Sequence, residues 1–173
     1  MFRSLAIIAL TVACLPAPAV TLRQLSMDQM TQSATAIVRA RVTGSSASFT
    51  GSAIYTHYKL QIVETWKGFA PSEVLLPGGA AKGLKQSVSG VPVLQVGSEY
   101  VMFLWTSSST GLTHLVGLTQ GLFNVSQQPD GSITVVRGEI GETILDGSGA
   151  AIRDRAVQMN LSDLKSRVSG GLK

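Results

Sequence analysis

The sequence predicts a mainly β protein: a small antiparallel Greek-key barrel of the OB-like type, with a short helix near each end. Three observations predict this fold. Period-two alternation of apolar and polar residues recurs in short segments. Turns rich in glycine and proline separate these segments at close intervals. Apolar residues at helical spacing stand before the first strand and after the last one. A two-sheet sandwich has the same strand spacing and remains the alternative architecture.

The amino-terminal residues have the pattern of a cleavable signal peptide, residues 1–19. Arg3 precedes an apolar run that is too short to span a bilayer as a helix. The small residues Ala17 and Ala19 stand three and one before a cut after Ala19. We therefore expect an exported chain, periplasmic or extracellular, whose residues 20–173 form one β-barrel domain.

Cys14 allows a second interpretation of the same segment. It follows a short apolar run and the small residue Ala13, as the first cysteine of a bacterial lipoprotein does, although Thr11 stands where such sites usually have leucine. Lipidation of Cys14, with anchoring to a membrane, is therefore the alternative to cleavage after Ala19. Cleavage would leave a chain without cysteine, which must be stabilised by its core because it cannot form a disulfide.

The charge pattern argues against nucleic acid as a partner. The chain has 14 basic and 10 acidic residues, and removal of the signal peptide would take away one basic residue and no acidic one. The basic residues are scattered, so no block is dense enough to follow a phosphate backbone. No later apolar run approaches the length of a membrane-spanning helix, so we expect no transmembrane segment after residue 19.

Local patterns place the two helices and the strands. Ser26 and Gln29 form a capping-box pattern in a short amphipathic helix within residues 21–33. Apolar residues at helical spacing predict a closing helix over residues 160–168. Alternation or continuous apolar character predicts strands at 36–42, 54–66, 73–76, 99–105, 112–118, 121–126 and 132–137. Residues 99–105 are apolar on both faces, which is typical of a central strand covered on both sides.

Residues 77–97 are the leading candidate for a binding surface. Glycines and prolines interrupt any periodicity there, which predicts a long loop, and loops of this length are usually functional. Two residues outside the loop join the candidates, although a binding role is the less favoured interpretation of each: burial explains the tryptophan better, and a bulge or close backbone approach explains the glutamine better. The candidate binding residues are Trp66, Pro77, Gly78, Gly79, Lys82, Lys85, Gln86 and Gln120.

No catalytic or metal-binding pattern emerges from the sequence. His57 and His114 are too few to form a zinc site by themselves. Ser162 and Lys165 have the spacing of a Ser-x-x-Lys nucleophile, but they lie on the closing helix. We expect no cofactor, no metal and no catalytic residue. A small hydrolase assembled only by folding is the least favoured alternative, and its available groups are His57, His114, Glu64 and Glu99.

Three segments of the chain resemble bacterial proteins related to the netrin/tissue-inhibitor-of-metalloprotease (NTR-like) module: SATAIVRARV (33–42), LQIVETWKG (60–68) and VGSEYVMF (96–103). A group of exported bacterial proteins without an established activity is more similar still, through PGG (77–79), QSVSGVP (86–92) and GLTQGLFNV (117–125). The resemblance implies an OB-like five-stranded barrel with additional elements. The inhibitors chelate zinc through an amino-terminal cysteine, whereas this mature chain would begin with Val20, so no inhibitory residue is carried over.

The sequence thus predicts a binding protein rather than an enzyme. We expect a non-catalytic exported module that presents residues 77–97 to a protein or peptide partner in the cell envelope. A structural or anchoring factor of the envelope is the second expectation, and lipidation at Cys14 would favour it. Neither the partner nor the oligomeric state follows from the residues.

Overall fold

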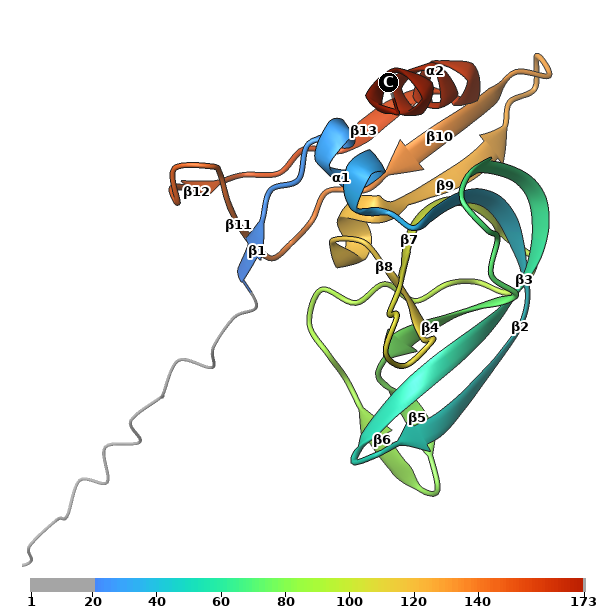
Figure 1. Cartoon of the computed structure of the whole chain (residues 1–173), viewed down its shortest axis with the longest axis vertical. Coiled ribbons are helices and arrows are strands. Elements are labelled where there is room, and N and C mark those ends of the chain that lie inside the picture. Colours follow the sequence, from blue (N-terminus) through green and yellow to red (C-terminus); the bar gives the residue numbers. More distant parts are fainter. Residues whose placement is uncertain (1–20, 173) are drawn as a thin grey trace, which may run out of the picture.

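The computed structural model describes residues 21–172, which form a mainly β fold with two helices (Figure 1). The fold class predicted from the sequence is therefore confirmed at this level. The signal peptide, its cut after Ala19 and Cys14 lie outside the described residues. Within the described part of the chain, no helix is long and apolar enough to cross a membrane.

The main sheet has the strand order β13-β10-β9-β7-β2-β3-β4, and β8 pairs with β7. Every pairing in this sheet is antiparallel. Its strands are β2 (Ala36–Thr50), β3 (Ala53–Lys67), β4 (Glu73–Pro77), β7 (Glu99–Thr106), β8 (Thr113–Leu115), β9 (Leu122–Gln127), β10 (Ile133–Arg137) and β13 (Val157–Asn160). The smaller elements are β1 (Thr21–Arg23), β5 (Gly79–Ala81), β6 (Leu84–Gln86), the 3-10 turn η1 (Leu118–Gly121), β11 (Thr143–Leu145) and β12 (Ala151–Ile152).

The long β2–β3 hairpin is strongly curved, and this curvature brings the edge strand β4 beside β8 (Figure 1). Register shifts between Ile37 and Val38, Arg39 and Ala40, and Val42 and Gly44 allow the bend, because each unpaired residue increases the local twist. No strand pairing joins β4 to β8 within residues 21–172, so the sheet does not close into a barrel there.

β7 lies between two hydrophobic clusters, as its apolar sequence predicts. Tyr100, Met102 and Leu104 point into one cluster, inside the curve formed by β2, β3 and β4. Val101 and Phe103 point into the other, which the two helices cover. The alternation of side chains along a strand produces this division. The continuous apolar run is therefore explained by burial on both faces.

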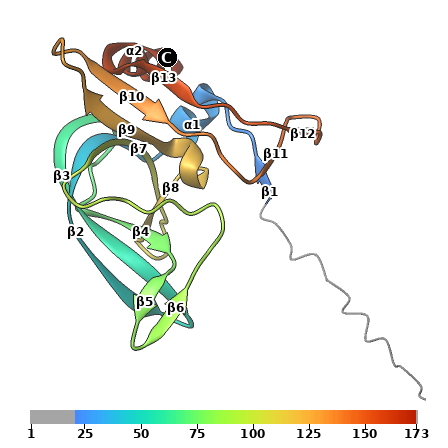
Figure 2. The ribbon, with the colours of Figure 1, turned by 180° about the vertical axis from the view of Figure 1, so that it is seen from behind.

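The helices α1 (Met27–Ser33) and α2 (Leu161–Gly171) pack against each other on one face of the sheet, where α2 contacts β10 and β13 and α1 contacts β7 (Figure 2). The predicted capping box is present: the Ser26 hydroxyl accepts from the Gln29 backbone N–H at 3.1 Å, and the Gln29 side chain accepts from the Ser26 N–H at 2.9 Å. Met30, Leu164 and Val168 from the two helices are buried in the cluster beneath them.

Several elements differ from those predicted; the strand expected at 112–118, for example, is limited to β8, and the 3-10 turn η1 begins at Leu118. β2 continues to Thr50 through the small polar residues 44–50. These residues form a strand because their backbone groups pair with β3. Residues 21–23 form β1, which pairs in parallel with β11, so the first helix begins only at Met27. Residues 77–97 contain the β5–β6 hairpin, and they are therefore not a loop without regular structure.

Candidate functional site

Residues 77–97 begin with the β5–β6 hairpin, which lies beside the end of the β2–β3 hairpin (Figure 2). Three hydrogen bonds connect the two hairpins. Gly78 N donates to Ile54 O at 2.7 Å, and Ile54 N donates to Gln86 Oε1 at 2.9 Å. The Thr56 hydroxyl donates to Gly78 O at 2.8 Å. The candidate residue Gln86 thus holds the hairpin in place.

The Gly78-Gly79 pair lets the two hairpins approach each other. Both residues have positive φ values, of 105° and 132° respectively, which L side chains rarely adopt. A Cβ atom on Gly79 would lie 2.6 Å from Thr56 Oγ1 and 3.0 Å from Ala47 Cβ. Pro77, Gly78 and Gly79 therefore turn the chain out of β4 and into the hairpin.

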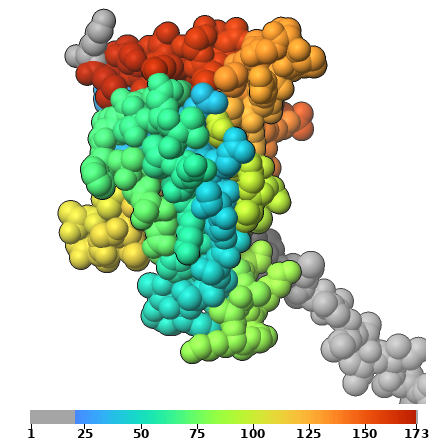
Figure 3. Space-filling model, turned by 90° about the vertical axis from the view of Figure 1, so that its right-hand side faces the viewer, coloured from blue at the N-terminus to red at the C-terminus, as the bar shows by residue number. Residues whose placement is uncertain are grey.

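The ends of the two hairpins expose apolar and basic side chains together. Phe49 is 36 % exposed and Leu84 is 61 % exposed. Lys82 Nζ lies 5.9 Å from the centre of the Phe49 ring, and Lys85 is exposed on the same short hairpin. We call these four residues the hairpin tip, which projects from one end of the molecule (Figure 3).

The hairpin tip has a uniform charge. The segments 43–56 and 78–98 contain no aspartate or glutamate, so the charged residues of these segments are the two lysines of the tip. The remainder of the candidate loop returns to the body of the protein. Ser89 Oγ donates to Glu142 Oε1 at 3.1 Å, and Gln95 N donates to the Tyr100 hydroxyl at 2.9 Å.

Trp66 and Gln120 are not part of this surface. The half-buried Trp66 packs against the cluster beneath the helices. Gln120 is 5 % exposed; its Oε1 accepts from Leu25 N at 2.8 Å, and its Nε2 donates to Arg23 O at 3.0 Å. The predicted close backbone approach is present at Gly121, where a Cβ atom would lie 2.4 Å from Val116 O.

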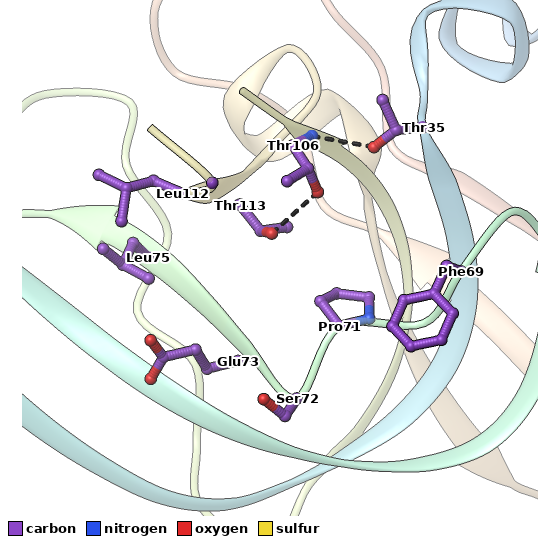
Figure 4. A pocket seen from close by; sticks show the side chains of 10 residues that line it. Thr35, Phe69, Pro71, Ser72, Glu73, Leu75, Thr106, Leu112 and Thr113 are labelled. Atoms are coloured by element: carbon purple, nitrogen blue, oxygen red, sulfur yellow. Dashed lines mark hydrogen bonds between the residues drawn. The ribbon is translucent and has the colours of Figure 1, made fainter. Parts of the chain in front are cut away.

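A pocket of about 490 Å³ lies between the start of β4 and the β7–β8 hairpin (Figure 4). Phe69 and Pro71, from the β3–β4 connection, line one side of it. Glu73 is the one charged residue of its lining, and its side chain is 45 % exposed. Sequence reasoning missed this pocket because its walls come from segments that only the curved sheet brings together.

Three threonines form the polar wall of this pocket. Thr106 N donates to Thr35 Oγ1 at 2.9 Å, and the hydroxyls of Thr106 and Thr113 are hydrogen-bonded at 2.9 Å. The wall is therefore held by bonds within the protein. Leu75 and Leu112 add apolar surface nearby, so the pocket combines apolar, hydroxyl and carboxylate groups.

A chain of side-chain contacts crosses β2, β3 and β4 through Ser48, His57 and Glu73. Ser48 Oγ is 3.0 Å from His57 Nε2, and His57 Nδ1 is 3.5 Å from Glu73 Oε1. The order of these three residues resembles the nucleophile, base and acid of a catalytic triad. Acyl transfer also needs hydrogen-bond donors beside the nucleophile that stabilise an oxyanion. The pocket is lined by Glu73 and by neither Ser48 nor His57. We therefore assign this chain of contacts no catalytic role.

The four groups of the hydrolase alternative have separate partners. Glu64 pairs with Lys165 of α2, and Glu99 pairs with Arg39 and Arg41. The Lys165 ammonium donates a hydrogen bond to Glu64 and thereby lowers the pKa of that carboxyl. His114 Nδ1 donates to Leu75 O at 3.1 Å. Over residues 21–172, no hydrogen bond or ion pair joins any two of the four, and no three His, Cys, Asp or Glu residues form a metal-binding group.

No protein-family model matches the chain, and a search of curated proteins finds no match either. The resemblance to the netrin/tissue-inhibitor module therefore stays a prediction that rests on the sequence segments alone.

Proposed function

We propose that residues 20–173 form an exported, non-catalytic binding module that presents the 77–97 segment to a protein or peptide partner, which binds at the hairpin tip that three residues of this segment form with Phe49. The observation that carries this proposal is the combination of Phe49 and Leu84, both exposed, with two lysines in segments that have no acidic residue. Export is supported by the signal-peptide pattern alone.

The composition of the hairpin tip favours an acidic partner that also has an apolar residue to bury. Exposed aromatic and aliphatic side chains supply the apolar area that a small interface needs at its centre. Lys82 and Lys85 would attract a carboxylate-bearing surface and fix its orientation. Binding should therefore weaken as salt is added, because the lysines are exposed and screened.

The two hairpins that carry the hairpin tip are held together by hydrogen bonds in the protein without a partner. The bonds from Gln86 and Gly78 to Ile54 fix the β5–β6 hairpin against β2 and β3. A surface that is ordered beforehand loses less conformational freedom on binding. This argues for the tip as a docking surface rather than for a loop that folds around its partner.

We further propose that the main sheet is an OB-like Greek-key barrel that is open between β4 and β8. The antiparallel order of β4, β3, β2 and β7, with β8 on the far side of β7, supports this topology. Such an arrangement leaves the connections between strands free to carry binding residues.

Selection from a displayed peptide library tests the proposed function, because a library samples many candidate partners at once. Immobilised residues 20–173 should enrich peptides with acidic and apolar residues. Lys82→Glu and Leu84→Ser should each weaken binding of the selected peptides roughly tenfold. The matched controls are Arg153→Glu and Val63→Ser, which change an exposed cation and an exposed aliphatic residue elsewhere.

Either of two results would overturn the proposal: a selection without sequence enrichment, or equal loss of binding in the tip variants and the controls. A photocrosslinking amino acid at position 84, compared with one at position 63, extends the test to the producing cell. Crosslinks formed only from position 84 would identify the partner that the tip contacts.

A further inference from the structure

Arg39 and Arg41 lie on the same face of β2 as Ile37. The β2–β7 pairing has no register shift from Ala36 to Arg41, so side chains two residues apart share one face. Ile37 is buried in the cluster beneath the helices, whereas the Arg41 side chain is 52 % exposed. The two arginines therefore lie at the end of this face that is open to solvent.

One carboxylate, that of Glu99 on β7, holds both arginines. Arg39 Nε donates to Glu99 Oε1, and Arg41 Nη2 donates to Glu99 Oε2 at 3.2 Å. The side chains of Arg39 and Glu99 are 19 % and 12 % exposed, so this pair is fixed more firmly than an ordinary surface ion pair. Both carboxylate oxygens are engaged, and two guanidinium groups are kept close together.

Most donors of the two guanidinium groups remain free. A guanidinium group has five N–H donors, and within residues 21–172 each of these two donates one side-chain hydrogen bond. A pocket of about 350 Å³ lies beside them, and Ser98 and Gln127 add a hydroxyl and an amide to its lining. The one carboxylate of the lining is already held by both arginines. The charged groups of the pocket can therefore offer a ligand donors rather than acceptors.

The charge of this pocket also favours an anion. Its lining has two guanidinium groups and one carboxylate, which leaves an excess of one positive charge. Glu64 is the neighbour of Arg39 on β3, but it is paired with Lys165 of α2, so these two charges cancel. An anion beside the arginines would compensate the remaining charge.

From this arrangement we infer an anion site at Arg39 and Arg41, which binds the phosphate or carboxylate group of an organic ligand. Arginine suits this role because its planar guanidinium presents paired N–H donors that match two oxygens of one oxyanion. The site shares no residue with the hairpin tip. It therefore does not depend on the proposed function.

The rest of the lining indicates what accompanies the oxyanion. Val125 of β9 and Ile133 of β10 line the same pocket, and both are half-buried. They would contact a short apolar group attached to the phosphate or carboxylate. The volume of about 350 Å³ lies at the lower end of the range of ordinary ligand sites, so the bound part of the ligand should be small.

The test titrates phenyl phosphate, benzoate and the uncharged benzyl alcohol into residues 20–173 and follows the NMR signals of the backbone amides and the arginine Nε–H groups. Phenyl phosphate and benzoate should shift the Nε–H signals of Arg39 and Arg41 and the amide signal of Val125, and benzyl alcohol should not. Arg41→Gln should weaken the binding of phenyl phosphate roughly tenfold, because charge-assisted hydrogen bonds are lost. Arg153→Gln, at an exposed arginine elsewhere, should bind as the natural chain does.

Two further arms refine the assignment. Arg41→Lys keeps the charge but loses the paired donors, so it should recover only part of the affinity that Arg41→Gln loses. Vesicles of phosphatidylglycerol, compared with vesicles of phosphatidylcholine, distinguish a lipid headgroup from a free ligand. Retention on phosphatidylglycerol that Arg41→Gln removes would assign the site to the headgroup, and binding of phenyl phosphate alone would assign it to a free organic anion.

Four outcomes would overturn the inference. The first is the absence of shifts at Arg39 and Arg41 at millimolar phenyl phosphate. The second is equal affinity of Arg41→Gln and Arg153→Gln for this ligand. The third is equal shifts from sodium chloride at the same ionic strength, which would indicate general screening rather than a site. The fourth is shifts confined to Lys82 and Lys85, which would place the anion at the hairpin tip and leave the proposed function intact.

Discussion

The guanidinium of Arg137 holds the carboxylate of Asp154 through two hydrogen bonds, Nη1 to Oδ2 at 2.8 Å and Nη2 to Oδ1 at 2.9 Å. The pair joins β10 to the segment that precedes β13. Ile140 N donates to the same carboxylate at 2.9 Å, and Arg137 also donates to Arg155 O at 3.1 Å. Burial raises the pKa of Asp154, but the hydrogen bonds and charge of Arg137 outweigh it, so the pKa of this carboxyl is lowered.

Asp154→Asn should destabilise the protein by about 2 kcal/mol at pH 7, because hydrogen bonds to a charged group contribute about that much. The lowered pKa determines the pH dependence. The stabilisation is present above the ordinary aspartate pKa of about 4 and is lost as pH falls through the lower folded value. Urea unfolding at pH 7 and at pH 3 should therefore show a larger difference between the two proteins at pH 7 than at pH 3. Glu139→Gln, at an exposed carboxylate, is the control; an equal effect there would contradict the prediction.

Gln120→Ala should cost about 1 to 3 kcal/mol, because it removes the two hydrogen bonds that the buried Gln120 side chain makes to Leu25 N and Arg23 O. The change should also speed hydrogen exchange at the Leu25 amide beyond the effect on the whole protein. Gln61→Ala, at an exposed site on β3, should change unfolding by less than about 0.5 kcal/mol. Unchanged exchange at Leu25 would show that Gln120 does not hold this segment.

Gly121→Ala should destabilise the protein by about 2 kcal/mol, because the added methyl group would stand 2.4 Å from Val116 O and 3.2 Å from Phe103 Cβ. The Val116 oxygen belongs to the backbone, which cannot move aside as easily as the end of a flexible side chain. Gly138→Ala meets no atom within 4 Å and is the matched control, expected to be neutral or slightly stabilising. Thermal unfolding of both variants measures the contrast, and equal midpoints would refute it.

Ser26→Ala should lower stability by about 1 kcal/mol, since it removes the hydroxyl that caps α1. Amide exchange should rise first at Gln29, whose N–H loses its acceptor. Ser45→Ala, at an exposed position of β2, should leave both quantities unchanged. Identical unfolding curves for Ser26→Ala and the natural chain would contradict this prediction.

Several local features of the fold could be predicted from the sequence because they depend on neighbours along the chain. The Ser26 capping box, the apolar run that forms β7 and the connection between the strands expected at 121–126 and 132–137 all lie where the pattern predicts them. The prediction of a connection at residues 44–50 is wrong, because small polar residues resemble a loop until a partner strand pairs with them. The prediction of irregular structure throughout residues 77–97 is wrong for the same reason.

The sequence by itself determined the mainly β class, the two helices and the choice of residues 77–97 as the candidate binding segment, since periodicity and turn chemistry are short-range properties. Only the tertiary structure decided which strands became neighbours. Gln120 bonds to a carbonyl 97 residues away, and the pocket joins Thr35, Glu73 and Thr113. Such contacts depend on how the bulged β2–β3 hairpin curves the sheet. That curvature is a collective result of pairing and burial, and no local pattern in the chain records it.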